Sequence, residues 1–121
     1  MSSPNFILLY VENPPASAAF YEKLMGMAPV ETSPTFCMFA LPSGIMLGLW
    51  GRGGVEPAAN APGGSELAFA VEDKAAVDAR HGEWHAAGLK IIQPPVAMDF
   101  GYTFAALDPD GHRLRVFAPG A

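Results

Sequence analysis

The sequence has a single cysteine, few charged residues and no long hydrophobic run. Cys37 is the only cysteine, which excludes a disulfide within one chain and is typical of proteins from a reducing cytoplasm. The apolar run Phe6 to Val11 is far shorter than the ~20 residues that a membrane-spanning helix needs. We therefore expect a cytoplasmic protein without a membrane partner.

Basic residues are also scarce. The chain carries 7 Lys and Arg against 12 Asp and Glu, for a formal net charge of -5. Such a surface repels phosphate backbones, so we expect no nucleic-acid partner. With 121 residues, half of them hydrophobic and only 16% charged, the composition excludes a disordered tail and predicts one folded domain with a core of its own.

What the sequence does contain is an internal repeat. An apolar run followed by Val-Glu-Asn ends at Asn13, and a second run followed by Val-Glu-Asp ends at Asp73. Asn and Asp are preferred N-cap residues, and the stretches Pro14 to Met25 and Lys74 to Ala87 are predicted to be helices. Each stretch then reaches a glycine, Gly26 or Gly88, which is a typical helix C-terminus.

The two copies resemble each other again near their ends. A Pro-x-Gly turn joins two strand-like runs in each copy, around Gly44 and around Gly111, which predicts a hairpin. Each copy is therefore expected to contain a strand, a helix and three strands. We place the first module at about 4–52, a linker at about 53–63 and the second module at about 64–118, within one domain spanning 1–121.

Side chains alternate across a strand, and this alternation separates two faces in each copy. One face is uniformly aliphatic or aromatic and is expected to pack under the helices. The other face mixes aromatic rings, a glycine and charged groups, which is the composition of a ligand surface rather than of a plain core.

The motifs Ala19-Phe20-Tyr21-Glu22-Lys23-Leu24-Met25-Gly26-Met27 and Asp108-Pro109-Asp110-Gly111-His112 resemble those of the vicinal oxygen chelate superfamily, the glyoxalase, bleomycin resistance and extradiol dioxygenase group. The resemblance covers nearly the whole chain. It implies an α+β fold in which two βαβββ modules form a curled mixed sheet around a cleft, with the helices on the outer face. It also implies a homodimer.

Enzymes of this superfamily hold a divalent metal through four side chains, and the resemblance places these positions on Phe6, Gly48, Glu66 and Arg115. Only Glu66 offers a metal ligand, because phenylalanine and glycine have no donor and a guanidinium is cationic. We therefore expect no metal and no other cofactor. In their place we predict an ion pair between Glu66 and Arg115, which either orients a ligand or merely fills a former metal site.

The remainder of the mixed face is aromatic and flexible, which suits a planar apolar ligand. Alternatively, these side chains fill the cleft themselves or form a dimer contact. The predicted ligand-binding residues are Phe6, Tyr10, Phe39, Met46, Gly48, Trp50, Glu66, Thr103, Arg115 and Phe117.

These observations favour a metal-independent binding protein that sequesters a small aromatic or hydrophobic molecule, as the metal-free antibiotic resistance proteins of the superfamily do. No catalytic residue is predicted. The alternative is a metal-dependent enzyme of the glyoxalase or dioxygenase type, with metal ligands beyond Glu66. A third hypothesis is a metal-free isomerase or cyclase with Glu66 as the base, which the neighbouring Arg115 opposes.

Three further side chains have been considered as functional groups. His81 and His85 are four residues apart on a predicted helix, a spacing that can bind zinc, but we expect a pair without a metal. Cys37 lies in an apolar run and is expected to be an inert, buried thiol.

Overall fold

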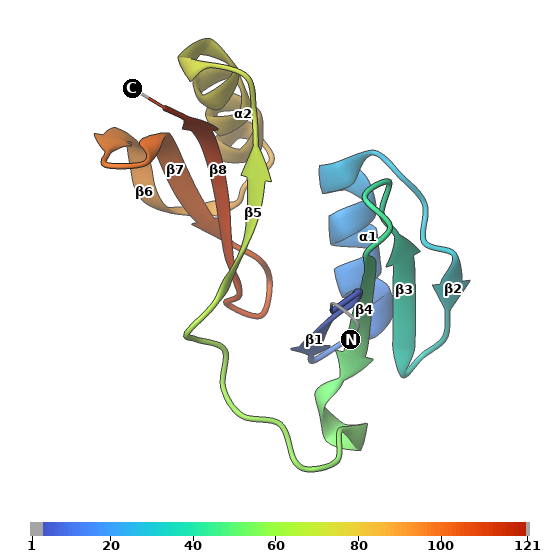
Figure 1. Cartoon of the computed structure of the whole chain (residues 1–121). Coiled ribbons are helices and arrows are strands. Elements are labelled where there is room, and N and C mark those ends of the chain that lie inside the picture. The colour runs from blue at the N-terminus through green and yellow to red at the C-terminus, as the bar shows by residue number, and fades with distance from the viewer. Residues whose placement is uncertain (1–3, 121) are drawn as a thin grey trace. The chain divides into compact units, whose positions relative to one another are not determined.

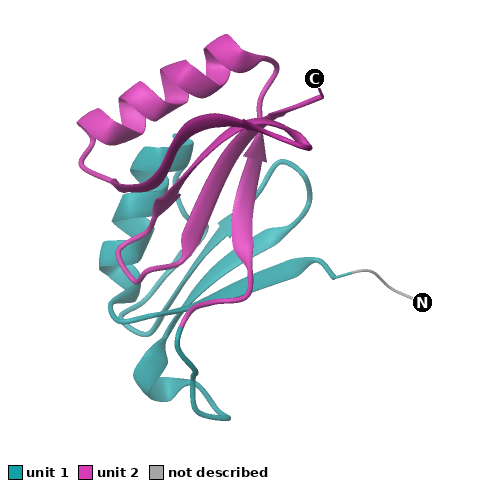
Figure 2. Ribbon diagram, turned by 90° about the vertical axis from the view of Figure 1, so that its left-hand side faces the viewer, with its two compact units in different colours: residues 1–61 teal, residues 62–121 magenta. Residues whose placement is uncertain are grey.

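Strand, helix and three strands follow one another twice along the chain in the computed structural model, which describes residues 4–120. The chain divides into two units, residues 1–61 and residues 62–121 (Figure 2). Unit 1 contains β1 (Phe6–Val11), α1 (Pro14–Met25), β2 (Glu31–Thr32), β3 (Phe36–Ala40), β4 (Met46–Gly51) and the short 3-10 helix η1 (Arg52–Gly54). Unit 2 contains β5 (Glu66–Ala70), α2 (Lys74–Ala86), β6 (Lys90–Met98), β7 (Gly101–Leu107) and β8 (Arg113–Pro119).

The two units share one topology. The strand order is β1-β4-β3-β2 in unit 1 and β5-β8-β7-β6 in unit 2 (Figure 1). In each unit the first strand pairs in parallel with the last, and the other pairings are antiparallel. The predicted α+β fold and its two βαβββ modules are confirmed, and the strands form two four-stranded mixed sheets, one in each unit.

The predicted helix ends depend on local hydrogen bonds. The side chain of Asn13 accepts a hydrogen bond from the backbone N–H of Ala16, and Asp73 does the same for Ala76. These contacts satisfy N–H groups that a helix start otherwise leaves without a partner. Helix α1 ends at Gly26 in the left-handed conformation. Helix α2 ends at Ala86, one residue earlier than predicted.

The alternation along the strands separates a core face from a second face, as predicted. Helix α1 packs against β3 and β4, and α2 packs against β6, β7 and β8. Under the helices lie the fully buried side chains Val11, Cys37, Leu49, Leu114 and Val116. Cys37 is therefore the buried, unpaired thiol that the sequence predicts. None of the helices within residues 4–120 has the length and apolarity to cross a membrane.

A glycine is required where β7 begins. Gly101 has a φ of 145° and faces the backbone of β8, so that a Cβ atom there would collide with the carbonyl oxygen of Ala118. This close approach holds the β7–β8 ladder at the end that carries Phe100 and Phe117. Gly82, within α2, has open space around it.

We expect opposite effects from the same substitution at these two glycines. Gly101→Ala is expected to lower the free energy of unfolding by more than about 1 kcal/mol, because alanine does not tolerate this backbone conformation or the contact. Gly82→Ala is expected to raise it by about 0.5–1 kcal/mol, because alanine is the better helix former. Urea unfolding of both variants beside the wild type measures the difference, and a neutral Gly101→Ala would contradict the described approach of β7 to β8.

Candidate functional site

A pocket of about 440 Å³ lies on the face of the unit 2 sheet that the helix does not cover. Its lining combines one ion pair with apolar side chains. The residues that line it are Glu66, Ala68, Met98, Phe100, Arg115 and Phe117. A volume of this size lies within the usual range for small-molecule sites.

Strand register brings the pocket residues together. The parallel ladder between β5 and β8 pairs Ala68 with Arg115 and Ala70 with Phe117. Because residues two apart on a strand share a face, Glu66 and Ala68 point to the same side as Arg115 and Phe117. The small side chain of Ala68 leaves space over the sheet next to the guanidinium.

Arg115 is held by three hydrogen bonds. Its Nε donates to Oε1 of Glu66 at 2.7 Å, and its Nη1 donates to Oε1 of Gln93 at 2.9 Å and to Oγ1 of Thr103 at 3.1 Å. The Arg115 side chain is 14% exposed and that of Glu66 is 33% exposed. The ion pair predicted from the sequence is therefore present, and the partners of Arg115 come from three other strands of its sheet.

The buried hydroxyl of Thr103 helps to hold Arg115 in place. Its side chain is fully buried, and its Oγ1 donates to the backbone carbonyl of Val116 at 2.8 Å while it accepts the hydrogen bond from Arg115. The hydroxyl is thus fixed by one bond in each direction. Thr103, predicted as a ligand contact, is fully buried and is not among the residues that line the pocket, so its contact with a ligand stays a prediction.

The apolar wall of the pocket is aromatic. The rings of Phe100 and Phe117 meet edge to face, with centroids 6.0 Å apart, and Cζ of Arg115 lies 5.9 Å from the centroid of Phe100. Phe100 is 44% exposed and Met98 is 46% exposed. Large apolar side chains exposed together at the edge of a pocket are typical of a binding surface.

Six predicted site residues lie in unit 1 instead, and all of them except Phe39 belong to β1 and β4. The ladder between β1 and β4 pairs Phe6 with Met46 and Tyr10 with Trp50, and it places Gly48 opposite Leu8. The Tyr10 and Trp50 rings meet edge to face at 6.1 Å. The predicted residues of β1 and β4 share the face of the unit 1 sheet opposite the core side chains, and their part in ligand binding stays a prediction.

The space above Gly48 is occupied by the chain itself. A Cβ atom there would lie 3.0 Å from the ring of Phe36 and 2.6 Å from Leu8 Cδ2. The ring that approaches the sheet at this glycine is therefore Phe36. The prediction for Phe39 is wrong, because Phe39 pairs with the core residue Leu47 and is fully buried on the helix side of the sheet.

Four residues around the unit 2 pocket were missed from the sequence. They are Ala68, Gln93, Met98 and Phe100. Ala68 lies two residues after Glu66 on β5 and therefore on the same face of the sheet, so its place in the pocket could have been predicted from the sequence. The others lie on or after β6, whose pairing with β7 shifts register on both sides of Gln93. No regular alternation marks these three residues.

The donor set does not fit the divalent metal that the superfamily resemblance implies. Of the four corresponding residues only Glu66 has a suitable oxygen, and that carboxylate already accepts a hydrogen bond from Arg115. Within residues 4–120 no three His, Cys, Asp or Glu side chains gather into a possible metal site. The rings of His81 and His85 lie 6.2 Å apart, and His81 packs against Phe104 in unit 2.

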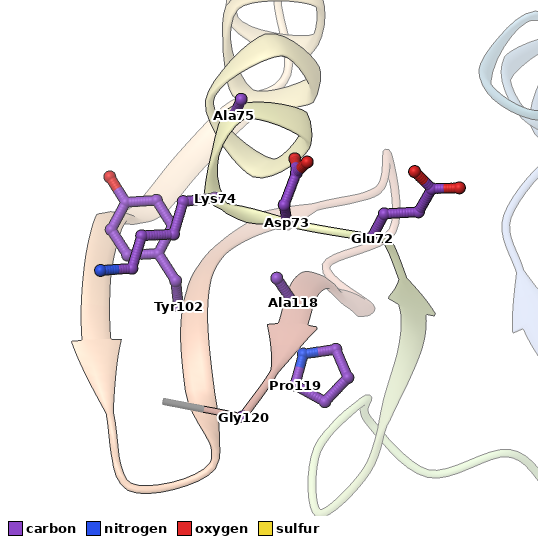
Figure 3. A pocket seen from close by; sticks show the side chains of 8 residues that line it. All are labelled: Glu72, Asp73, Lys74, Ala75, Tyr102, Ala118, Pro119 and Gly120. Atoms are coloured by element: carbon purple, nitrogen blue, oxygen red, sulfur yellow. The ribbon is translucent and has the colours of Figure 1, made fainter.

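A second pocket, of about 480 Å³, lies at the start of α2. Figure 3 shows the Lys74 side chain beside the ring of Tyr102, and the ammonium lies 5.7 Å from the ring centroid. The hydroxyl of Tyr102 donates to Oδ1 of Asp78 at 2.9 Å. Because the Asp73 carboxylate is already engaged as the helix cap, we assign no ligand to this pocket.

The chain belongs to the Glyoxalase/Bleomycin resistance protein/Dioxygenase superfamily, whose sequence model matches residues 3–116. Over 117 residues it is 33% identical to the phenazine antibiotic resistance protein EhpR of Enterobacter agglomerans, with 94% of this chain and 90% of the relative covered.

Solved structures agree with this membership. The solution structure of protein ATC0852 from Agrobacterium tumefaciens is 54% identical, with a TM-score of 0.92 and 100% of both chains covered. A glyoxalase-related enzyme from Fulvimarina pelagi is 27% identical, with a TM-score of 0.85, and the match covers 98% of this chain and 88% of that one.

Removing the guanidinium is expected to destabilise unit 2. Arg115→Leu eliminates three hydrogen bonds and leaves the Glu66 carboxylate beside an apolar side chain. We expect a loss of about 1–2 kcal/mol, since Glu66 is partly exposed and regains water. Arg113→Leu on the same strand is the control, because the Arg113 side chain is exposed and no hydrogen bond or ion pair joins it to the described residues. Equal unfolding midpoints for the two variants would contradict a structural role for the network.

The second pocket gives a prediction about pH. The hydrogen bond to Asp78, with smaller contributions from desolvation and from the carboxylate charge, raises the pKa of Tyr102 above its usual 10.0. The folded state therefore keeps the phenol proton to higher pH than the unfolded state does. The stabilisation is complete below pH 10 and is lost as the pH rises through the raised pKa. Ultraviolet titration should show a tyrosine pKa that falls in Asp78→Ala, and an unchanged titration would contradict the bond.

Proposed function

We propose that the protein is a metal-independent binding protein that sequesters a small planar aromatic molecule. The observation that carries the proposal is the unit 2 pocket, where the immobilised guanidinium of Arg115 stands beside the exposed rings of Phe100 and Phe117. Aromatic rings and a guanidinium both present flat surfaces that stack on a planar ligand. The site is therefore prepared before the ligand arrives, which lowers the entropic cost of binding.

The curated relative supports an antibiotic as the ligand. EhpR is a phenazine antibiotic resistance protein, and phenazine is a planar, tricyclic aromatic compound with two ring nitrogens. A protein that binds such a molecule tightly protects a cell by lowering its free concentration, without any chemical step. We extend this role to the present chain as sequestration of a planar antibiotic of the phenazine type.

The second candidate is a metal-dependent enzyme of the glyoxalase or dioxygenase type. The likeness to a glyoxalase-related enzyme favours it. Against it stand the donor set and the engagement of Glu66 with Arg115, which leaves that carboxylate unsuited both as a metal ligand and as a free base. Elemental analysis of protein incubated with Zn²⁺, Ni²⁺, Mn²⁺ and Fe²⁺ separates the candidates, because a stoichiometric ion that restores isomerase or dioxygenase activity would support the enzyme.

We also propose a cytoplasmic homodimer, as the superfamily resemblance implies. Light scattering coupled to size-exclusion chromatography tests the oligomeric state directly. A monomer at all concentrations would contradict this part of the proposal without affecting the pocket.

Truncation of the aromatic wall tests the proposed function. Titration calorimetry with phenazine is expected to show saturable binding to the wild type. Phe117→Ala and Phe100→Ala are each expected to weaken it about tenfold, since each removes a ring contact and apolar area. Val30→Ala, an exposed apolar residue of unit 1, is the control and is expected to leave the affinity unchanged. Failure of phenazine and of other planar antibiotics to bind the wild type would contradict the proposed function.

A further inference from the structure

We propose that the unit 2 pocket selects planar ligands with a single uncharged hydrogen-bond acceptor, such as a ring nitrogen or a carbonyl oxygen, over ligands with a carboxylate at the same place. This inference rests on the proposed binding function and specifies the chemical class of the ligand. It follows from which donors of Arg115 remain available and from the charge beside them.

Most of the donors of Arg115 are already engaged. A guanidinium has five N–H groups: one on Nε and two on each Nη. Nε donates to Glu66, and Nη1 donates to both Gln93 and Thr103. The hydrogen bonds of Arg115 to the described residues therefore use three N–H groups, and none of them uses Nη2. A ligand is left with the two N–H groups of this one nitrogen.

The remaining donors of Arg115 do not suit the geometry of a carboxylate. Carboxylates bind arginine best through two parallel hydrogen bonds from neighbouring nitrogens. Each neighbouring pair of Arg115 includes Nη2 and one nitrogen that is already engaged, either Nε or Nη1. A carboxylate is therefore limited to a single-point contact, whereas a ring nitrogen or a carbonyl oxygen needs only one donor and loses nothing.

The charge of Glu66 also disfavours an anionic ligand. The Glu66 carboxylate lies 2.7 Å from Nε and neutralises the guanidinium. An anionic ligand would place a second carboxylate on the same cation, which adds like-charge repulsion to the cost of desolvating the ligand. A neutral acceptor avoids both costs.

The aromatic wall lies beside the guanidinium of Arg115. Cζ of Arg115 lies 5.9 Å from the centroid of Phe100, and Phe100 is in edge-to-face contact with Phe117. A ligand that stacks on this wall while bonding to Nη2 must carry its acceptor in the ring system or directly attached to it. Fused heteroaromatic compounds meet this requirement.

The experiment compares three probes by titration calorimetry at neutral pH: phenazine, anthracene, which lacks an acceptor, and phenazine-1-carboxylate, which is anionic. Wild-type protein is expected to bind phenazine about three- to tenfold more tightly than anthracene, and more tightly than phenazine-1-carboxylate. In Arg115→Met the preference for phenazine over anthracene should disappear.

Glu66→Gln is the decisive variant, because it retains an acceptor for Nε but removes the negative charge. It is expected to raise the affinity for phenazine-1-carboxylate about tenfold relative to phenazine. Glu31→Gln, an exposed acid on β2, makes the same change in net charge elsewhere and should leave the preference unaltered.

The outcomes separate this inference from the proposed function. Binding of phenazine-1-carboxylate to the wild type as tightly as phenazine, or more tightly, would overturn the selectivity while leaving the binding function intact. Equal affinities for phenazine and anthracene would overturn the role of Nη2. Absence of binding for all three probes would overturn the proposed function itself.

Discussion

The unit 2 site depends on how a cation is held against a sheet. The Arg115 side chain is largely buried, and a buried charge is stable only when it is paired and hydrogen-bonded. Glu66 supplies the opposite charge from β5, Thr103 supplies a fixed oxygen from β7, and Gln93 supplies an amide oxygen from β6. All four strands of the sheet thus contribute to one guanidinium, and its position is as well defined as the strand register itself.

Residue type, and not topology, distinguishes the corresponding positions of the two units. Both units have the same strand order and the same parallel pairing of first and last strands. The corresponding face of unit 1 presents Phe6 and Gly48, which carry no polar group, and the space at Gly48 is taken by Phe36 and Leu8. One topology therefore supports an ion pair in one unit and a largely aromatic surface in the other.

The sequence predicts those features that depend on local chemistry. The caps at Asn13 and Asp73 define the helix starts, and the alternation along β5 and β8 places Glu66 and Arg115 on one face. What it does not supply is register between strands. The sequence does not distinguish the face of Phe39, because every residue of β3 is apolar and no polar alternation marks the two sides. The sequence did not predict Phe100 and Gln93 as site residues, because β6 is interrupted by register shifts and carries no regular pattern.

A purely structural reading of the ion pair explains only part of the site. If Arg115 only fills the space of a former metal ion, its N–H groups still need hydrogen-bond acceptors. Glu66, Gln93 and Thr103 provide these acceptors. It does not require Met98 and Phe100 to be nearly half exposed beside the guanidinium, since exposing large apolar side chains costs about 25 cal/mol per Å² left in water. A ligand that covers these side chains recovers this free energy. The exposed apolar wall, more than the ion pair, is what favours the proposed binding site over the remnant of a metal centre.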